Sequence, residues 1–368
     1  MDNTKVHELF SKFPKVSLGF YPTPLHKLET LSVFRNQIKR QAMQQLIDGL
    51  NDIAPSFKRE DFSGVSLFGG NKIRKLEYIL GAAKAAGAEY AFTYGATQSN
   101  HAMETAGACC RCGVKPVLFL YALIDPSEED LRGNMLLDRL YGAEIHITSR
   151  REGESVEELK KRNAATGEAY RQQLIQQGHI CWDIPVGGAT ELGSVGFVEG
   201  FIELESQMAA LGLHADYLFH ATGSGGTLAG LQAARALLGS DTEIISINVN
   251  KKGPDYLDDI VRLANGTLSL LGAPDGLRVQ REDLHIDPGY YLPGYEQPNE
   301  ASNEAIRILA RKEGLVVDPV YTGKGLAGML DYLHTGKIPK GSTAVFLHTG
   351  GAAALFAEKE LLGDLLKA

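Results

Sequence analysis

The sequence predicts an α/β fold built from two open, twisted, mainly parallel sheets that are flanked by helices. Short apolar runs alternate with segments of helical periodicity, which is the pattern of parallel strands joined by crossover helices. A glycine-rich segment at residues 187–196 interrupts this alternation, and a second series of the same kind follows it. The 368-residue chain is long enough for about two domains. We therefore expect two α/β units, with the chain crossing between them near residues 187–196.

The first series follows a lead-in segment. Pro22 and Pro24 make residues 14–35 unsuitable for a helix, so this stretch is expected to be extended, whereas residues 36–54 are polar and helix-prone. The strands expected next are short apolar runs at 91–94, 117–120 and 145–147. The expected helices lie at 100–112, 130–141 and 151–178. Gly113 and Gly178 end two of them, since glycine readily adopts the left-handed conformation common at helix C-termini.

The second series completes the pattern. Its expected strands are apolar runs at 217–221, 244–247 and 345–347. Its expected helices lie at 299–313, with Gly314 as the stop, and at 352–367. In open parallel sheets, ligands bind beyond the carboxyl ends of the strands, so the loops after these strands are the candidate site.

Charge and composition exclude several kinds of partner. The net charge of −8, the pI near 5.7 and the lack of a basic block argue against a nucleic-acid partner. No apolar run reaches the length of a signal segment or a membrane span, so we expect no membrane partner and a cytoplasmic location. The cysteines, at 109, 110, 112 and 181, lack a second ligand pair at metal-binding spacing. We therefore expect no metal site.

The stretch from Gly69 to Glu77 carries the first functional signal. A helical pattern begins there, yet Lys72, Arg74 and Lys75 crowd its first turn, where the helix dipole is positive and acidic residues are usual. A lysine held in such a place loses its proton more easily, and a neutral amine is what Schiff-base chemistry requires. The alternative is a Gly-Gly turn with Asn71 as the helix cap and solvated cations.

A second signal is the segment Thr222–Thr227, directly after the expected strand 217–221. Its residues Gly223, Ser224, Gly225, Gly226 and Thr227 would fold the backbone around a phosphate at a helix N-terminus. It is not a P-loop, and Leu228 replaces the third glycine of a dinucleotide fingerprint. The segment predicts a cradle for one phosphate. The alternative is a strand-to-helix turn without a ligand.

Three further loops carry polar side chains. Ser99 and Asn100 either cap the helix 100–112 or, with His101 beside them, bind a carboxylate at its N-terminus. Thr349 either caps the last helix or faces a ligand. Tyr295 and Tyr321 lie on loops stiffened by proline and glycine, where an ordinary core or surface tyrosine is the alternative. A reactive lysine, a single-phosphate cradle, a carboxylate site and tyrosines together suit a pyridoxal phosphate enzyme acting on an amino acid.

On these residues the chain resembles a known family. The shared motifs occur in the family's order, at residues 22–25, 69–77, 98–100, 185–188, 223–227, 318–324 and 348–351. The chain looks like the D-cysteine desulfhydrase and 1-aminocyclopropane-1-carboxylate deaminase group, pyridoxal phosphate enzymes of the tryptophan synthase β type (fold type II). The resemblance covers roughly residues 16–35 and 57–360. It implies a homodimer and a cofactor between a large domain (1–72 and 189–368) and a small domain (73–188).

The resemblance also implies roles for individual residues. Lys72 would be the Schiff-base lysine, and Lys75 with the 223–227 loop would hold the phosphate. Asn100 would approach the phenolic oxygen of the cofactor, and Ser99, Asn100 and His101 the substrate carboxylate. Tyr295 and Tyr321 match two active-site tyrosines, and Ser99 would join them as a catalytic residue. Tyr321 and Thr349 would also contact the cofactor.

Two positions separate the subfamilies. The deaminases carry Glu after the second tyrosine and Leu before the final glycine pair, whereas Thr322 and Thr349 follow the desulfhydrase pattern. A hydroxyl partner would not keep the pyridine nitrogen protonated, which weakens the electron sink but suffices when a good leaving group departs from Cβ. The resemblance therefore implies a β-elimination lyase that converts D-cysteine to pyruvate, ammonia and sulfide. The alternatives are a deaminase of 1-aminocyclopropane-1-carboxylate, a lyase acting on another β-substituted amino acid such as cysteate, and a catalytically silent protein that binds pyridoxal phosphate or an amino acid.

The chain departs from the family pattern in two places. Residues 36–56 are longer than the usual connection. After His101, Ala102-Met103-Glu104 replace the usual Val/Thr-Arg-Gln, so the first helical turn lacks a basic residue. Because this turn faces the expected carboxylate site, the second departure concerns the substrate more than the cofactor.

Overall fold

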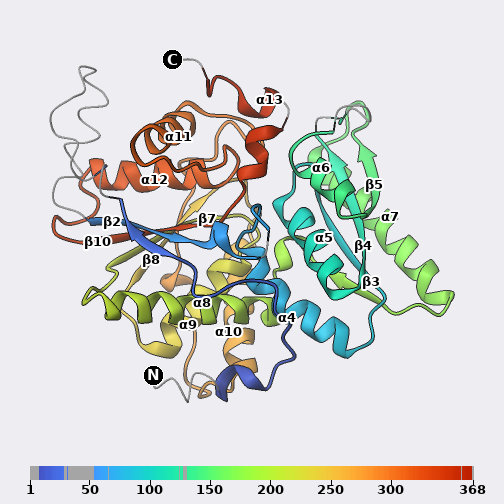
Figure 1. Ribbon diagram of the computed structural model, residues 1–368, viewed down its shortest axis with the longest axis horizontal. Coiled ribbons are helices and arrows are strands. Elements are labelled where there is room, and N and C mark those ends of the chain that lie inside the picture. Colours follow the sequence, from blue (N-terminus) through green and yellow to red (C-terminus); the bar gives the residue numbers. More distant parts are fainter. Residues whose placement is uncertain are drawn as a thin grey trace.

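The computed structural model describes residues 8–28, 31, 54–64, 66–123, 125–126, 131–357 and 359–366. Their strands form two separate sheets (Figure 1). The larger sheet has six strands in the order β1 (Leu25–Lys27), β2 (Ala54–Arg59), β10 (Thr343–His348), β7 (Tyr217–Thr222), β8 (Glu243–Asn248) and β9 (His285–Asp287). The smaller has four, in the order β5 (Glu144–Ser149), β4 (Lys115–Ala122), β3 (Tyr90–Ala96) and β6 (Cys181–Ile184).

All strand pairs except β1 with β2 are parallel, as predicted. Helices α5 (Asn100–Cys112), α6 (Gly133–Leu140) and α7 (Val156–Gln176) accompany the small sheet. Helices α8 (Glu191–Ala210), α9 (Gly226–Leu238), α10 (Tyr256–Leu271), α11 (Glu300–Glu313) and α12 (Thr322–His334) accompany the large one. Helix α4 (Lys72–Ala85) lies where the two parts meet (Figure 1). The predicted α/β class and its two sheets are therefore confirmed.

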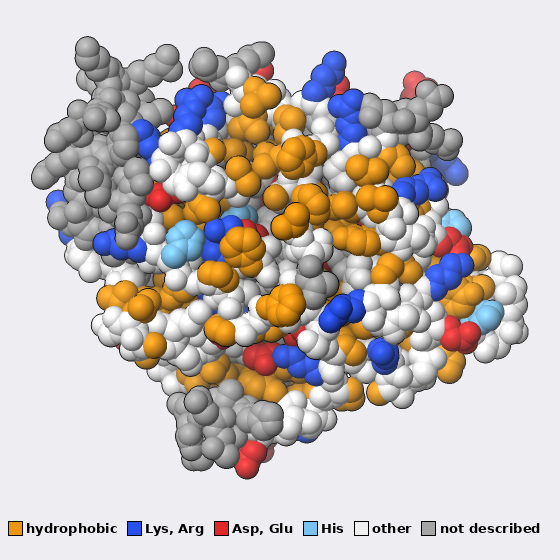
Figure 2. Space-filling view, viewed as in Figure 1, with side chains coloured by type: hydrophobic (Ala, Val, Ile, Leu, Met, Phe, Trp, Pro, Cys, Tyr) orange, Lys and Arg blue, Asp and Glu red, His pale blue; other side chains and the backbone are white. Residues whose placement is uncertain are grey.

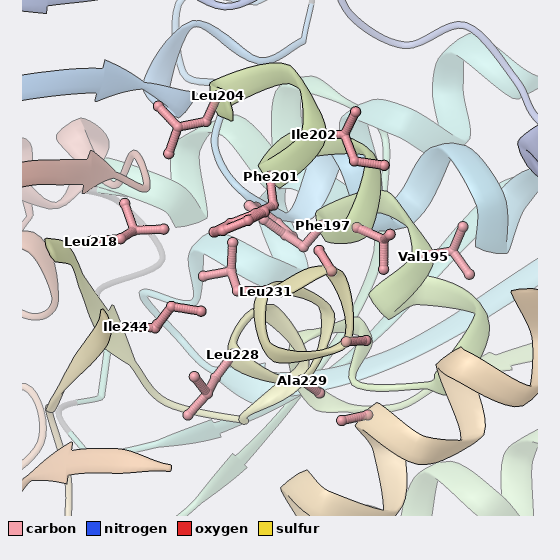
Figure 3. Close-up of a cluster of buried hydrophobic side chains, with 14 of the residues drawn as sticks. Val195, Phe197, Phe201, Ile202, Leu204, Leu218, Leu228, Ala229, Leu231 and Ile244 are labelled. Atoms are coloured by element: carbon pink, nitrogen blue, oxygen red, sulfur yellow. The ribbon is translucent and has the colours of Figure 1, made fainter. Parts of the chain in front are cut away.

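The large sheet is covered on both faces, which explains why its central strands are nearly continuous apolar runs. Leu218 and Ile244 point to a core shared with α8 and α9, which Figure 3 shows with Phe201 and Leu231. The next residue of each strand points to the opposite face, where a second core packs against α11 and α12. Alternation of side chains along a strand thus places one core on each side of the sheet.

Close helix packing accounts for part of the glycine-rich segment. Helix α8 begins inside 187–196, so this stretch is not only a connection between the two parts. A Cβ atom at Gly196 would lie 2.2 Å from the carbonyl oxygen of Arg74, and one at Gly230 would lie 2.3 Å from that of Ser194. These glycines allow α8 to approach α4 and α9 more closely than a side chain permits. The chain crosses from the small sheet to the large one between β6 and β7.

Two sequence expectations need correction. The expected helix 352–367 is instead a short 3-10 helix, η4 (Ala352–Phe356), followed by the four-residue α13 (Lys359–Leu362). Ala357 is extended and Gly363 has a φ of 54°, and neither conformation continues a helix. The expected helix 151–178 starts later, at Val156, where Ser155 and Glu158 form a capping box. The helix-prone stretch 36–54 lies outside the described residues except for Ala54, which opens β2.

The distribution of basic side chains on the surface bears on the kind of partner the protein could bind. On the face drawn in Figure 2, Lys and Arg side chains are scattered among other residues and form no continuous stripe. In the described part of the chain, no helix combines the length and the hydropathy needed to cross a membrane.

Candidate active site

A cavity lies beyond the carboxyl ends of strands from both sheets, as the strand topology predicts. Loops after β3 and β7, the end of β4 and the N-terminus of α4 surround it. The lining residues are Asn71, Lys72, Lys75, Gly95, Ala96, Ser99, His101, Tyr121, Val186, Gly187, Ala221, Thr222, Gly223, Ser224, Gly225, Thr227, Tyr295, Tyr321 and Thr349. Most of the predicted site residues therefore meet in one cavity. Asn100 and Gly226 are not among the lining residues.

Lys72 is the first residue of α4 and is partly buried. Burial lowers the pKa of its amine below the ordinary value, and the charges of Glu104 and Asp318 partly oppose that shift. Its Nζ lies 5.3 Å from the centre of the Tyr321 ring. A lysine with a lowered pKa that opens into a cavity can act as a nucleophile and as a base.

The sequence also allowed a non-functional interpretation of the start of α4, in which Asn71 caps the helix and the cations are solvated. The structure differs from it. Asn71 does not cap the helix, and its Nδ2 donates to Thr227 Oγ1 at 2.9 Å. The backbone N–H of Lys72 instead donates to Glu104 Oε2 at 3.0 Å. Arg74 and Lys75 are each only 1% exposed, so they are not solvated. That alternative is wrong for this helix.

Arg74 turns away from the cavity. Its Nε donates to Glu60 Oε2 at 2.6 Å, and its second terminal nitrogen contacts Glu60 Oε1 and Glu203 Oε1, both at 2.9 Å. This buried network ties α4 to η1 (Glu60–Phe62) and to α8. Arg74 thus holds the lysine-bearing helix in place.

Lys75 lines the cavity one turn after Lys72. Its Nζ donates to the carbonyl oxygen of Gly187 at 2.6 Å. Burial, together with the charge of Lys72, lowers the pKa of Lys75 to about 7. Gly187 packs against the 223–227 loop, since a Cβ atom there would lie 2.1 Å from Ser224 Oγ. Lys75 therefore places an amine close to the proposed phosphate cradle, and a bound phosphate would favour its charged form.

The 223–227 loop joins β7 to α9 and has the features of an anion site. Gly225 adopts a φ of +88° immediately before the first residue of α9, a conformation that favours glycine. Free N–H groups at the start of a helix bind anions. Gly223, Ser224, Gly225 and Thr227 line the cavity. Gly226 instead packs on Ala189, whose Cα would lie 2.9 Å from an added Cβ.

At the start of α5, the three residues predicted to bind the substrate carboxylate have different surroundings. Ser99 is the N-cap, and its hydroxyl accepts the Ala102 N–H at 3.2 Å while it also lines the cavity. His101 lines the cavity, and its Nε2 is 2.7 Å from Thr93 Oγ1. Burial and the nearby lysines lower the pKa of His101 well below its ordinary value, so this ring is neutral at pH 7. Asn100 is buried, with its Oδ1 accepting from Asn134 Nδ2 at 2.7 Å.

The two predicted tyrosines meet across the cavity wall. Their hydroxyl oxygens are 2.5 Å apart, and their rings pack edge to face. Burial raises the pKa of both hydroxyls above the ordinary value. The turn that carries Tyr321 is fixed by Asp318, whose carboxylate accepts the N–H groups of Val320, Tyr321 and Thr322.

The two threonines of the subfamily pattern differ in their surroundings. Thr349 lines the cavity, and its carbonyl oxygen accepts the Asn71 N–H at 3.1 Å. Thr322 is fully buried, and its hydroxyl donates to Asp318 Oδ1 at 2.6 Å. Thr349 is therefore the one of the pair that a ligand in the cavity could reach directly.

Several site residues escaped the sequence reasoning. Tyr121 is the second-to-last residue of β4 and lines the cavity, and its place near the carboxyl end of a strand is the signal that could have found it. Lys252 donates to the carbonyl oxygen of Gly223, and it follows β8 in the same way. Burial lowers the pKa of Lys252 to about 7. Glu104 and Asn71 act through partners far away in sequence, which no local motif reveals.

The residues present fit pyridoxal phosphate. A partly buried lysine, an adjacent cation and a loop of helix N-terminal N–H groups match its aldehyde and its phosphate. Among the described residues, no group of three or more His, Cys, Asp or Glu side chains is placed to hold a metal ion. Two parallel sheets with this donor set between them define the class of pyridoxal phosphate enzymes of the tryptophan synthase β type.

Comparison with known proteins agrees with this class. The family model described as "Pyridoxal-phosphate dependent enzyme" matches residues 16–350. A Pyrococcus furiosus protein with the provisional name 1-aminocyclopropane-1-carboxylate deaminase is 36% identical over 353 residues, which is 96% of each chain. D-cysteine desulfhydrase of Salmonella choleraesuis is 33% identical over 355 residues, or 96% of this chain and 98% of the relative.

Solved structures extend the agreement to the fold. The crystal structure of a 1-aminocyclopropane-1-carboxylate deaminase homologue superposes with a TM-score of 0.82 at 30% identity, covering 100% of this chain and 99% of the other. An O-ureido-L-serine synthase, with a TM-score of 0.60 at 15% identity over 92% of each chain, shares the fold alone. The chain belongs to the pyridoxal-phosphate dependent enzyme family. Pyridoxal phosphate is its cofactor, and its reaction class is that of the deaminase and desulfhydrase group of lyases.

Proposed function

We propose that this enzyme is a β-elimination lyase that converts D-cysteine to pyruvate, ammonia and sulfide. The observation that carries this proposal is the set of groups around Lys72. Its amine, with a lowered pKa, lies beside Tyr321, in a cavity that the 223–227 loop and the N-terminus of α5 also line. Among the described residues, no Asp or Glu lines the cavity, and Thr349 does. A hydroxyl partner suits an elimination with a good leaving group better than the opening of a cyclopropane ring.

Lys72, Lys75 and the 223–227 loop would hold the cofactor. When bound, pyridoxal phosphate supplies an electron sink for negative charge that develops at the substrate Cα. The loop N–H groups and the nearby Lys75 would bind the phosphate. Lys72 would carry the aldehyde carbon until the substrate amino group replaces it, and the freed amine would then take the Cα proton.

The N-terminus of α5 would bind the substrate carboxylate. Ser99 already uses its hydroxyl as a helix cap, and its position at the cavity leaves it able to contact an anion. Because the His101 ring is neutral at pH 7, it would contribute a hydrogen bond and no charge. Because the first turn of α5 has no basic residue, helix N–H groups and hydroxyls would bind the substrate carboxylate.

The elimination balances without a redox partner. The Cα proton moves to Lys72, the Cα electron pair forms the Cα–Cβ double bond, and the Cβ–S bond breaks to release sulfide. The released aminoacrylate takes up water and yields pyruvate and ammonia. Tyr295 and Tyr321 keep their protons at neutral pH because burial raises the pKa of both, so one of them would orient the substrate or donate a proton.

Replacement of Lys72 tests the cofactor assignment. In Lys72→Ala, we expect loss of the visible absorbance of the lysine-bound cofactor and loss of pyruvate formation. The matched control is Lys84→Ala, which removes an exposed lysine from the other end of α4. An unchanged spectrum in Lys72→Ala would contradict the assignment.

A substrate panel tests the reaction. Pyruvate release is expected to be fastest from D-cysteine in a set that also contains L-cysteine and cysteate. The second candidate is deamination of 1-aminocyclopropane-1-carboxylate, which the provisional name of the Pyrococcus furiosus relative favours. Its product is 2-oxobutyrate, so an assay that separates the two oxo acids distinguishes the candidates. Cofactor absorbance without turnover of any amino acid would support a silent binding protein.

A further inference from the structure

Glu104 is a buried carboxyl group that contacts the backbone of the reactive lysine. It lies on α5 one turn after His101 and is 3% exposed. Its Oε2 accepts the backbone N–H of Lys72 at 3.0 Å. Its Oε1 closely approaches Gly70, where an added Cβ would be only 2.6 Å away. The carboxyl group thus takes the capping position at the start of α4 that Asn71 leaves open.

The surroundings of Glu104 determine whether it is charged and which groups its charge affects. Glu104 lines a mainly apolar cavity together with Ile73, Met103 and Tyr141, whereas its partner Lys72 lines the active-site cavity. Burial raises the pKa of Glu104 to about 7, although Lys72, Lys75 and the N–H groups of Lys72 and Ile73 oppose the shift. The charged and titratable groups that face this region are Lys72 and Lys75 on α4, His101 and Arg111 on α5, Tyr141 after α6, and Asp318 with Tyr321 at α12.

The attraction between Glu104 and Lys72 affects both residues, because it favours the carboxylate form of Glu104 and the ammonium form of Lys72. Burial lowers the pKa of Lys72, and Glu104 opposes that shift more strongly than Asp318 does. Glutamine has nearly the same shape as glutamate but carries no charge. Its amide oxygen could still accept the Lys72 N–H, so a comparison of the two residues at this position isolates the effect of the charge.

We propose that Glu104 is a positioning residue that caps the first turn of α4 and whose negative charge sets the pH range in which Lys72 holds its proton. In the wild type, Lys72 stays protonated to a higher pH than the same lysine would above a glutamine. The catalytic use of the Lys72 proton rests on the proposed function. The electrostatic coupling between Glu104 and Lys72 does not depend on it.

The coupling can be measured on the full-length protein freed of cofactor. Lys72 is labelled with an amine-reactive reagent at a series of pH values, and the labelled peptide is quantified by mass spectrometry. Only the neutral amine reacts, so the midpoint reports the pKa of Lys72. In Glu104→Gln we expect the midpoint to fall by about one pH unit. Below the midpoint, labelling should accordingly be about tenfold faster than in the wild type.

Two variants separate the charge from a structural effect. Glu104→Asp keeps the charge, and its midpoint should stay nearer to that of the wild type than to that of Glu104→Gln. Glu77→Gln is the matched control, because Glu77 is also a buried carboxyl group at α4 that accepts a backbone N–H, from Leu18, but its ionic partner is Lys15. Its Lys72 midpoint should not move. Equal midpoints in the wild type and Glu104→Gln would overturn the inference.

Activity gives an independent second readout. In the cofactor-loaded enzyme, the acidic limb of the pH–rate profile should shift to lower pH in Glu104→Gln and stay in place in Glu77→Gln. If no amino acid releases pyruvate from the wild type, the proposed function fails, while the labelling midpoints still decide the role of Glu104. If pyruvate forms and the midpoints coincide, only the inference on Glu104 fails.

Discussion

The hydroxyl oxygens of Tyr295 and Tyr321 lie 2.5 Å apart, although the two residues come from different loops. Tyr321 follows the Asp318 turn, and Tyr295 lies between Pro293 and Pro298. In a bond between two hydroxyls only one of the protons lies between the oxygens, so the other hydroxyl hydrogen is free to point into the cavity. Because burial raises the pKa of both groups, the pair remains protonated and can donate one hydrogen bond to a substrate.

Removing one hydroxyl of this pair should slow the reaction without unfolding the protein. For Tyr321→Phe and Tyr295→Phe we expect kcat for pyruvate formation to fall about 10²-fold or more, the usual contribution of a positioned acid–base group. The cofactor spectrum should persist, since Lys72 is untouched. Tyr290→Phe is the control, because Tyr290 donates to Asp331 at 2.6 Å and does not line the cavity. Full kcat in both pair variants would show that neither hydroxyl takes part.

The resemblance to the desulfhydrases rests partly on Thr322, and the hydroxyl of this residue contacts Asp318. Thr322→Val should therefore lower the free energy of unfolding by about 1–3 kcal/mol, because the buried Asp318 loses a hydrogen-bond partner. Thr322→Glu should not create deamination of 1-aminocyclopropane-1-carboxylate, since it places a second carboxylate against Asp318 in a buried site. Urea unfolding and a 2-oxobutyrate assay check the two expectations. Measurable 2-oxobutyrate from soluble Thr322→Glu would contradict the second.

The Glu60–Arg74 pair should make stability depend on acid pH. Burial alone would raise the pKa of Glu60, but the charge and hydrogen bonds of Arg74 outweigh it and lower the pKa to about 2. A folded-state pKa below the unfolded value contributes stability that is present above about pH 4.5 and is lost as the pH falls toward 2. Glu60→Gln should cost about 3–5 kcal/mol at pH 7, because it leaves the buried Arg74 charge without its main partner.

Urea unfolding at several pH values measures the difference in unfolding free energy between the wild type and Glu60→Gln. The gap between the wild type and Glu60→Gln should narrow as the pH is lowered below 4.5, where the wild-type carboxylate begins to take up its proton. Glu168→Gln, which breaks the exposed pair with Arg171, should leave the urea midpoint unchanged and serves as the control. A gap of constant size over this pH range would show that the charge of Glu60 does not stabilise the fold.

At this site, features encoded by neighbouring residues could be predicted from the sequence, whereas contacts between residues distant in the sequence could not. Lys72 and the 223–227 loop stand out because a helix start and a strand-to-helix turn are local patterns. The bond from Asn71 to Thr227 and the capping of α4 by Glu104 join residues 156 and 32 positions apart, and no local pattern encodes them. The expected helix at 352–367 shows the reverse error, since a helix-prone alanine run is interrupted by the extended backbone of Ala357 and the positive φ of Gly363.

Gly196 shows why the lysine-bearing helix depends on its neighbour. At this position α8 lies so close to α4 that an added Cβ would be 2.2 Å from the Arg74 carbonyl oxygen, a backbone atom that cannot rotate away. Gly196→Ala should therefore push the helices apart and cost about 1–3 kcal/mol of unfolding free energy, despite the better helix propensity of alanine.

The displacement should also reach the site, because Arg74 lies two residues from Lys72. We expect Gly196→Ala to weaken cofactor binding, measured as the loss of visible absorbance on dilution or dialysis. Gly276→Ala is the control, since an added Cβ there meets no atom within 4 Å. If Gly196→Ala matched the wild type in both unfolding midpoint and cofactor retention, α4 would have to adjust without moving Lys72. The buried contacts of Arg74 with Glu60 and Glu203 argue against such freedom, because they fix the position of α4.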